Sequence, residues 1–105
     1  MNFETCIASC QETHRLCLEL ATRGDDQINP ALLRTLLDTA EMTQTTADFM
    51  LRRSVHAVRV TSLCVQICEA CAKACEAESG DLSVQRCGFA ARRCIASCRA
   101  LKSAA

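Results

Sequence analysis

The chain has 105 residues, which is enough for one compact domain spanning residues 1–105 and too few for two. Its 12 basic and 12 acidic residues cancel, so no global attraction to nucleic acid or to anionic lipid is expected. Half of the residues are apolar but only 3 are aromatic, so leucine, valine, alanine, methionine and cysteine must form the core. With 3 glycines and 1 proline, turns are scarce, which argues against a sheet-rich fold.

Cysteine is the most unusual part of the composition, with 10 residues. In a small secreted domain this number would suggest a disulfide scaffold. The start of the chain, however, has no basic segment followed by an apolar one, and Glu4, Gln11 and Glu12 interrupt it. No apolar run approaches the length of a membrane span. We therefore expect a cytoplasmic protein without membrane contact, whose thiols stay reduced.

The first predicted helix covers residues 3–22. Cys6, Cys10 and Cys17 share one face of it, and His14 is placed between the last two on the same stripe. Gly24 followed by two aspartates ends the helix, as a glycine C-cap followed by turn formers does.

The second predicted helix covers residues 30–52, with Asn29 as N-cap and Pro30 in the first turn. It contains no cysteine. A single helix from residue 30 to residue 79 would be about 75 Å long and would leave most of its apolar face without a partner. We therefore predict a reversal near residues 52–54, with Ser54 as the next N-cap.

The third predicted helix covers residues 55–78, and it carries the densest cysteine pattern of the chain. Cys64, Cys68, Cys71 and Cys75 follow the spacing i, i+4, i+7 and i+11, which is one continuous stripe on a helix. A single cysteine on such a face is most often a small buried hydrophobe. Four in register, repeated elsewhere in the chain, indicate instead that a ligand binds there.

The fourth predicted helix covers residues 82–102, after a turn at residues 79–81, with residues 102–105 as a frayed tail. Cys87, Cys94 and Cys98 share its inner face. Four amphipathic helices with short connections predict an all-α, antiparallel four-helix bundle with the cysteines in its centre.

Several kinds of site are compatible with a core lined by thiols. Soft thiolates select Cu(I), Zn(II) or iron–sulfur clusters. The pairs Cys6/Cys10, Cys64/Cys68, Cys71/Cys75 and Cys94/Cys98 are four residues apart, with Cβ atoms about 5–6 Å apart on a helix, so disulfides within a helix would be strained and the pairs look like metal ligands. Repeated pairs suit several Cu(I) ions better than one zinc.

The alternatives are weaker. A ferredoxin-type cluster needs a further Cys-x-x step and a following proline in a loop, whereas Cys75 is followed by Glu76 in a helix. A thioredoxin-type site needs a βαβ unit, and no such pattern surrounds Cys68 and Cys71. No nucleophile with a base is found, so the chain is not expected to be an enzyme. A structural bundle with packed cysteines and at most one zinc site is the remaining alternative.

The Cys-x-x-x-Cys pairs, with the segment from Ile67 to Glu76 as their most specific part, resemble those of the copper storage proteins, which are bacterial four-helix bundles lined by cysteine. The resemblance implies Cu(I) sequestered by thiolates, a cytoplasmic form and a homotetramer. Helix 2 of the family usually carries cysteines and its helix 1 more than three, so less copper is expected here. The implied ligands are Cys6, Cys10, Cys17, Cys64, Cys68, Cys71, Cys75, Cys87, Cys94 and Cys98.

Three further expectations concern residues other than cysteine. His14 is a candidate auxiliary ligand, the alternative being a packed histidine bonded to water or a carbonyl. His56 and Met50 lie near the helix 2–helix 3 reversal, where the family places soft ligands, although an exposed histidine and a core methionine are favoured. Thr39, Thr43 and Thr46 take the cysteine spacing in helix 2 and should form a wall without metal ligands. Apolar residues in excess of one inner face predict an oligomer: Leu32, Leu33, Phe49, Leu51 and Val58.

Overall fold

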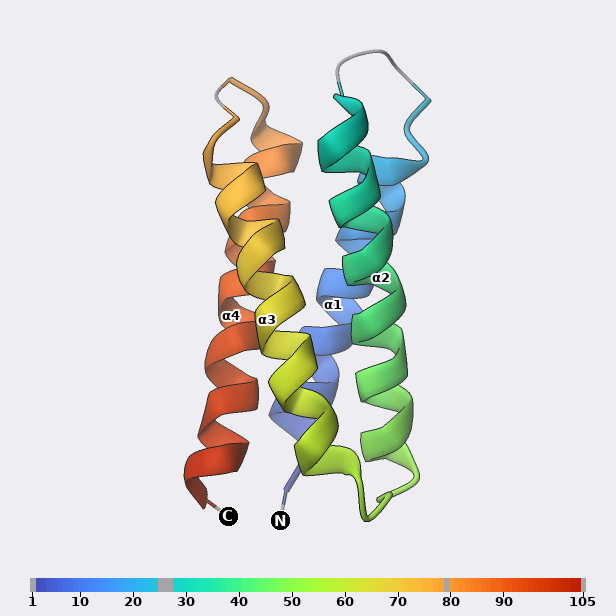
Figure 1. Cartoon of the computed structure of the whole chain (residues 1–105), viewed down its shortest axis with the longest axis vertical. Helices are drawn as coiled ribbons and strands as arrows, with labels where there is room; N and C mark the ends of the chain where they lie inside the picture. The colour runs from blue at the N-terminus through green and yellow to red at the C-terminus, as the bar shows by residue number, and fades with distance from the viewer. Residues whose placement is uncertain (1, 25–27, 79, 105) are drawn as a thin grey trace.

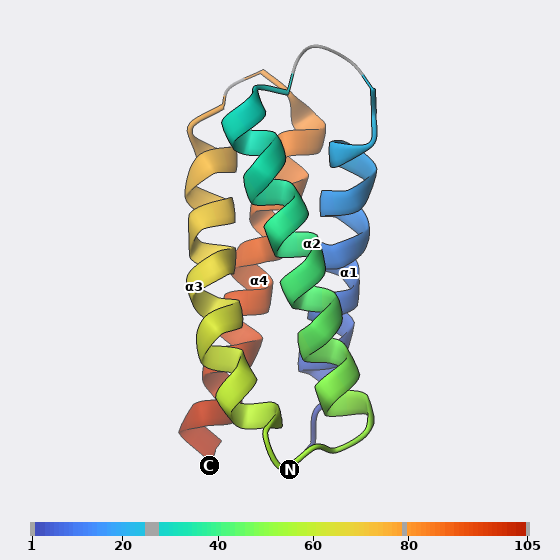
Figure 2. The ribbon, with the colours of Figure 1, turned by 45° about the vertical axis from the view of Figure 1, so that its right-hand side comes forward.

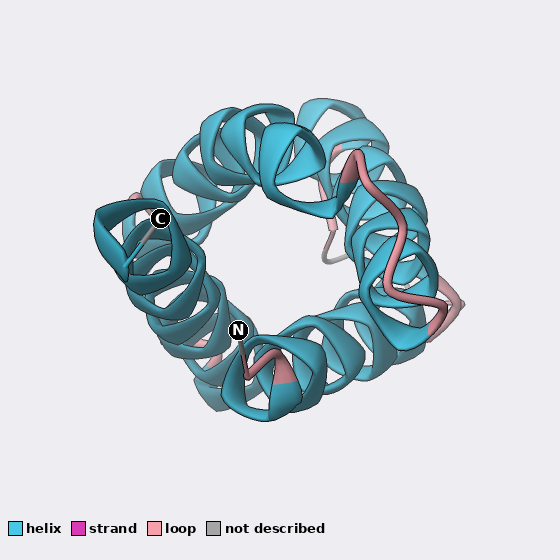
Figure 3. Ribbon diagram, turned by 90° about the horizontal axis from the view of Figure 1, so that it is seen from below, coloured by secondary structure: helices cyan, strands magenta, loops and turns pink. Residues whose placement is uncertain are grey.

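The computed structural model describes residues 2–24, 28–78 and 80–104, and Figure 1 shows them as four helices. These are α1 (Glu4–Ala21), α2 (Pro30–Leu51), α3 (Ala57–Glu76) and α4 (Leu82–Ala104). Neighbouring helices run in opposite directions, and α1, α2, α3 and α4 follow one another around a common axis (Figures 1 and 3). The predicted all-α antiparallel four-helix bundle is therefore confirmed.

The two ends of the bundle differ, and we name them by what they carry. The N-terminus, the C-terminus and the α2–α3 turn share one end, called here the termini end (Figures 1 and 2). The α1–α2 and α3–α4 connections lie at the opposite end, called here the loop end. Together the helices form a rod about 42 Å long.

Local capping explains where α2 and α4 begin. The Asn29 side chain accepts a hydrogen bond from the Leu32 N–H at 2.8 Å, with Pro30 as the first helical residue, as predicted. Asp81 Oδ1 accepts from the Ser83 N–H at 3.0 Å and so caps α4. The other carboxylate oxygen of Asp81 pairs with Arg23 at 2.9 Å, and this guanidinium is the main reason why the pKa of Asp81 is lowered. The pair fastens the end of α1 to the start of α4.

The α2–α3 reversal falls where the sequence predicted it, but its cause is a residue that the sequence did not single out. Arg53 has a left-handed backbone, with φ of 51°. The Ser54 N–H bonds to Phe49 O and the Arg53 N–H bonds to Met50 O, each at 3.0 Å, which is the Schellman arrangement that usually employs glycine. Ser54 Oγ then accepts from the His56 N–H at 3.1 Å, so Ser54 caps a first turn and the α-helix proper begins two residues later than predicted, at Ala57.

Two further differences from the predictions concern α4 and the core. The α4 helix continues to Ala104 instead of fraying from residue 102, since no glycine or proline stops it. Leu32, predicted as surplus to the inner face, is a core residue on α2. The predicted turn at Ser79 and the two aspartates after Gly24 lie outside the described residues.

Helices α3 and α4 approach each other closely at Gly88. A Cβ atom added to Gly88 would lie 2.9 Å from the Cβ atom of Cys75, a distance that real side chains do not show. The absence of a side chain at Gly88 therefore lets α4 pack directly on a cysteine of α3. Within the described part of the chain, no helix combines the length and apolarity needed to cross a membrane.

Candidate metal centre

All ten cysteines lie in the core as free thiols, none more than 2% exposed. They come from α1, α3 and α4. They are spaced three or four residues apart on α3 and four or seven apart on α1 and α4, so each helix directs one stripe of sulfur atoms toward the common axis. Apolar side chains close both ends of this column. Phe3, Met50, Ala57 and Leu101 are buried toward the termini end, and Leu20, Leu32, Leu36 and Val84 toward the loop end.

The shortest sulfur–sulfur contacts connect different helices. Cys17 Sγ lies 3.2 Å from Cys87 Sγ, and Cys6 Sγ lies 3.3 Å from Cys98 Sγ. Cys10 and Cys94 are 3.6 Å apart. Within one helix, the contact between Cys64 and Cys68 measures 4.0 Å. The cysteine pairs that the sequence placed on single helices therefore interlock with pairs on the facing helices.

The sulfur atoms fall into two groups along the axis. In one, Cys10, Cys64, Cys94 and Cys98 lie within 4.8 Å of one another, and in the other Cys17, Cys71 and Cys87 do. Cys6 and Cys68 join the first group through their contacts with Cys98 and Cys64. We assign Cys75 to the second group, because it follows Cys71 by one helical turn on the stripe of α3 and packs against Gly88, next to Cys87 in the sequence. We call them the termini-side pool (Cys6, Cys10, Cys64, Cys68, Cys94, Cys98) and the loop-side pool (Cys17, Cys71, Cys75, Cys87).

Hydrogen bonds within the termini-side pool lower the pKa of some thiols and raise the pKa of others. The pKa of Cys6 is lowered to about 4, chiefly by Cys10 and then by Cys98, and the pKa of Cys94 is lowered to about 6, first by Cys10. The pKa of Cys64 is also lowered, with Cys10 as the main cause. The pKa of Cys10 is raised because its thiol donates to Cys6 first and then to Cys64. Neighbouring S–H groups can thus stabilise buried thiolates before any metal binds.

The loop-side pool repeats this division on a smaller scale. The pKa of Cys71 is lowered, first by Cys17. The pKa of Cys17 is raised mainly by Cys71, and that of Cys75 mainly by Cys71 followed by Cys87. One acceptor is thus surrounded by thiols that keep their protons, so a soft metal ion must displace those protons when it binds.

Helix α2 contributes threonines to the same core. Thr39, Thr43 and Thr46 are completely buried, as their spacing predicted. Each hydroxyl donates to the carbonyl four residues earlier: Thr39 to Thr35 at 2.7 Å, Thr43 to Thr39 at 2.7 Å and Thr46 to Met42 at 2.8 Å. These hydroxyls are satisfied by the backbone of α2, so this side of the column has no thiol.

His14 does not lie on the cysteine stripe, contrary to the prediction. Thr13 occupies the buried position between Cys10 and Cys17. His14 is half-buried beside α2, where its Nδ1 atom lies 2.7 Å from Ala40 O. Both positions are three or four residues from Cys10 and Cys17, so spacing alone did not distinguish them. Thr61 on α3 is a second buried stripe residue that the sequence reasoning missed, although its spacing from Cys64 was visible.

The two residues predicted near the reversal take the positions that were favoured for them. Met50 is buried in the core at the termini end, and His56 is exposed on the α2–α3 turn. Neither belongs to a group of clustered metal-binding side chains among the described residues.

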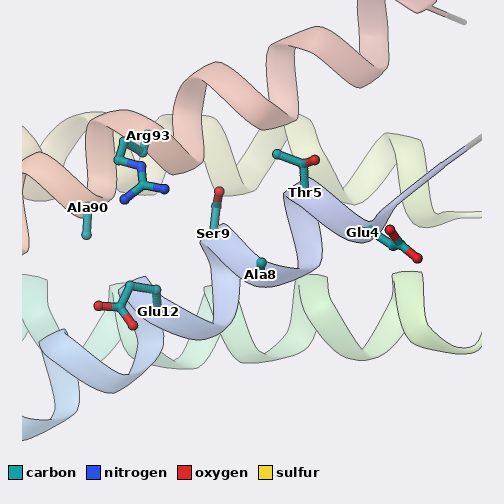
Figure 4. Close-up of a pocket in the computed structure, with 7 residues that line it drawn as sticks. All are labelled: Glu4, Thr5, Ala8, Ser9, Glu12, Ala90 and Arg93. Carbon is teal, nitrogen blue, oxygen red and sulfur yellow. The ribbon is translucent and has the colours of Figure 1, made fainter.

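The surface carries open grooves that are unrelated to the sulfur atoms. One of about 550 Å³ lies between α1 and α4 and is lined by Glu4, Thr5, Ala8, Ser9, Glu12, Ala90 and Arg93 (Figure 4). The lining contains no cysteine, and its carboxylates lie on the outer side of α1. The soft ligands lie instead in the packed core.

Comparisons with known proteins agree with this geometry. The sequence model of the copper storage protein family, Csp, matches residues 1–103. Among solved structures, the chain resembles the Nmul_A1745 protein from Nitrosospira multiformis, with a TM-score of 0.86 and 32% sequence identity over 99% of this chain and 97% of that one. No curated protein matches the chain. With its ten buried thiols gathered on the axis of a four-helix bundle, this chain belongs to the copper storage protein family.

Proposed function

We propose that the protein stores copper as Cu(I), held by the thiolates of all ten cysteines inside the bundle. The observation that carries the proposal is the packing of ten free thiols against one another, from three helices, in a core whose fourth side, α2, contributes buried threonines and no thiol. The role is sequestration and not catalysis, which agrees with the family to which the chain belongs.

The donor set supports Cu(I) in particular. Thiolates are soft ligands, and Cu(I) is the soft ion among the common biological metals. Cu(I) accepts two or three thiolates, so sulfur atoms 3.2–4.0 Å apart can share an ion, and Cys17, which contacts both Cys71 and Cys87, can bridge successive ions. The core also excludes water, because the thiols are buried and apolar side chains close both ends. Bound ions are thereby kept from solvent and oxidants.

One feature of the core gives zinc a place as the second candidate. Cys10, Cys64, Cys94 and Cys98 come from three helices and lie within 4.8 Å of one another. Four thiolates that converge in this way suit the closed tetrahedral site of a structural Zn(II) ion. Under this alternative the remaining cysteines would serve as packing, and the bundle would hold one ion.

Copper titration separates the two. Protein reduced and kept under anaerobic conditions would be titrated with Cu(I) in competition with a chromogenic Cu(I) chelator, with thiols and metal measured in the same samples. We expect several Cu(I) ions per chain, approaching the number of thiols if thiolates bridge. We also expect the loaded protein to unfold at a higher temperature, because ligands that bind only the folded state stabilise it. Uptake of one ion or fewer would contradict the proposal and favour the structural bundle.

Three parts of the proposal rest on the family resemblance or on composition more than on the site. We propose a cytoplasmic location, where thiols stay reduced, and a homotetrameric assembly. His14 stays a prediction as an auxiliary ligand: its Nδ1 atom is bonded to Ala40 O, which leaves Nε2 as the nitrogen that would bind.

A further inference from the structure

The sulfur column is divided in the middle by residues without thiols. On α1, Thr13 stands between Cys10 and Cys17, and on α4, Ala91 stands between Cys87 and Cys94. Both are completely buried. The Thr13 hydroxyl donates to Ser9 O at 2.8 Å and lies 3.1 Å from Ala90 O, so it connects α1 to α4 through the backbone at this level. We call Thr13 and Ala91 the thiol-free layer.

The distances between sulfur atoms agree with this division. Each sulfur–sulfur contact of 4.0 Å or less between described residues joins members of the same pool. Two thiolates on one metal ion lie at most about 4.6 Å apart, taking the metal–sulfur bond as about 2.3 Å. The groups of three or more clustered ligands found in the described chain, with ligand atoms within 4.8 Å of one another, each lie in one pool, and none of them mixes the two pools.

Helix α2 contributes no thiol that could connect the two pools. Thr39 and Thr43 on α2 are buried, but their hydroxyls are committed to carbonyls of their own helix. On α1 and α4 seven residues separate the nearest thiols of the two pools, whereas on α3 only three residues separate Cys68 from Cys71. Cys68 Sγ contacts Cys64 Sγ at 4.0 Å, whereas Cys71 Sγ contacts Cys17 Sγ at 3.9 Å and clusters with Cys17 and Cys87. Two consecutive cysteines of α3 therefore belong to different pools.

We propose that the core binds Cu(I) as two separate thiolate clusters, one in the six-thiol termini-side pool and one in the four-thiol loop-side pool, with Thr13 and Ala91 as the separator. The inference rests on the proposed function and adds to it how the copper is partitioned. Each cluster forms by ligand exchange, in which Cu(I) binds two or more sulfur atoms and their protons leave to solvent or to the departing ligand, with no change of oxidation state. Because no thiolate is shared, filling one pool leaves the other pool's affinity unchanged.

Matched double variants test this independence. Cys17→Ser with Cys87→Ser removes half of the loop-side pool, and Cys10→Ser with Cys94→Ser removes the equivalent facing pair of the termini-side pool. Each would be titrated with Cu(I) against the chelator, with native mass spectrometry reporting the loaded species. We expect each variant to lose capacity while the affinity of the intact pool changes by less than about twofold, since separate sites are additive within about 0.5 kcal/mol. A larger change in the affinity of the intact pool would overturn the proposal.

A variant that keeps every native thiol tests the separator directly. Ala91→Cys places a thiol in the thiol-free layer and should couple the pools, so that the two phases of copper uptake merge into one. Ala40→Cys adds a thiol at a buried position on α2 beside His14 and should leave the two phases as they are. Equal behaviour of Ala91→Cys and Ala40→Cys, or a single phase in the native protein, would refute the division. If the native protein takes up one ion or fewer, the proposed function itself fails; several ions in one undivided phase would refute the two-cluster arrangement alone.

Discussion

Cysteine and threonine occupy equivalent positions in this core, and they differ in chemistry much more than in size. Five threonines are completely buried: Thr13 and Thr61 lie on the cysteine stripes of α1 and α3, and Thr39, Thr43 and Thr46 lie on the inner face of α2. A threonine side chain is close to cysteine in size, and its hydroxyl donates a hydrogen bond to a backbone carbonyl, so the bundle keeps its packing. A neutral hydroxyl is nevertheless a poor ligand for a soft ion. The pattern of cysteine and threonine along each stripe therefore decides where copper can bind without changing the fold.

At the scale of the residue, we predict that Thr43→Cys raises the Cu(I) capacity, by up to roughly one ion if the added thiolate bridges. Thr43 is completely buried, and its replacement would bring α2 into the coordinating surface. Thr45→Cys is the matched control, because Thr45 is only half-buried and lies off the stripe. Chelator competition measures both variants. Equal capacities for the two would show that the facing direction assigned to α2 is incorrect.

At the scale of the element, contacts between helices determine which cysteines meet. Gly88 allows α4 to reach the Cβ atom of Cys75, and this close approach helps to hold Cys75 and Cys87 in one pool. The Arg23–Asp81 pair fastens the end of α1 beside the start of α4 at the same end of the bundle. The loop-side pool is thus positioned by close packing and by a polar contact between helix ends.

We predict that Gly88→Ala destabilises the protein. Alanine favours a helix by about 1 kcal/mol over glycine, but overpacking a tight seam costs about 1–3 kcal/mol. The added Cβ atom would meet the Cys75 Cβ atom at 2.9 Å, and neither atom is the end of a flexible side chain, so the steric cost should dominate, with a net loss of up to about 2 kcal/mol. Urea unfolding of the apo protein measures this difference. A more stable variant would contradict this prediction and show that α3 and α4 can move apart at little cost in free energy.

At the scale of the whole molecule, the outer surface retains large apolar side chains. Leu51, Leu63, Leu82 and Phe89 are more than half exposed, with Phe89 at 68%. Of the residues predicted to be surplus to the inner face, Leu33, Phe49 and Val58 are half-buried, Leu51 is exposed and Leu32 is buried in the core. Association with further copies of the chain would bury these side chains.

We therefore predict an oligomer in solution. Light scattering at micromolar concentration should give a mass that is a multiple of the 11.4 kDa chain, with the tetramer expected from the family resemblance. Measuring the apo and copper-loaded forms side by side would separate assembly from metal binding, since copper lies inside each bundle under the proposal. A monomeric mass for both forms would contradict this prediction.

The sequence by itself determined the elements and the side that each one buries. Hydrophobic and cysteine spacings of three and four residues define helices with one inner stripe, and Asn29 with Pro30 marks a helix start by local chemistry alone. For this reason the bundle, its cysteine-lined axis and the buried threonines of α2 could be predicted from single residues and their spacing.

Only the tertiary structure decided the details within that frame. Spacing defines a helix face to within about one residue, since successive residues are about 100° apart, so it did not separate Thr13 from His14. The left-handed Arg53 that ends α2 carries no sequence signal, because a non-glycine residue takes that conformation only where the surrounding packing holds it. The division of ten thiols into two pools depends on the axial offset between antiparallel helices. That offset is a property of how the helices pack, and no single helix contains it.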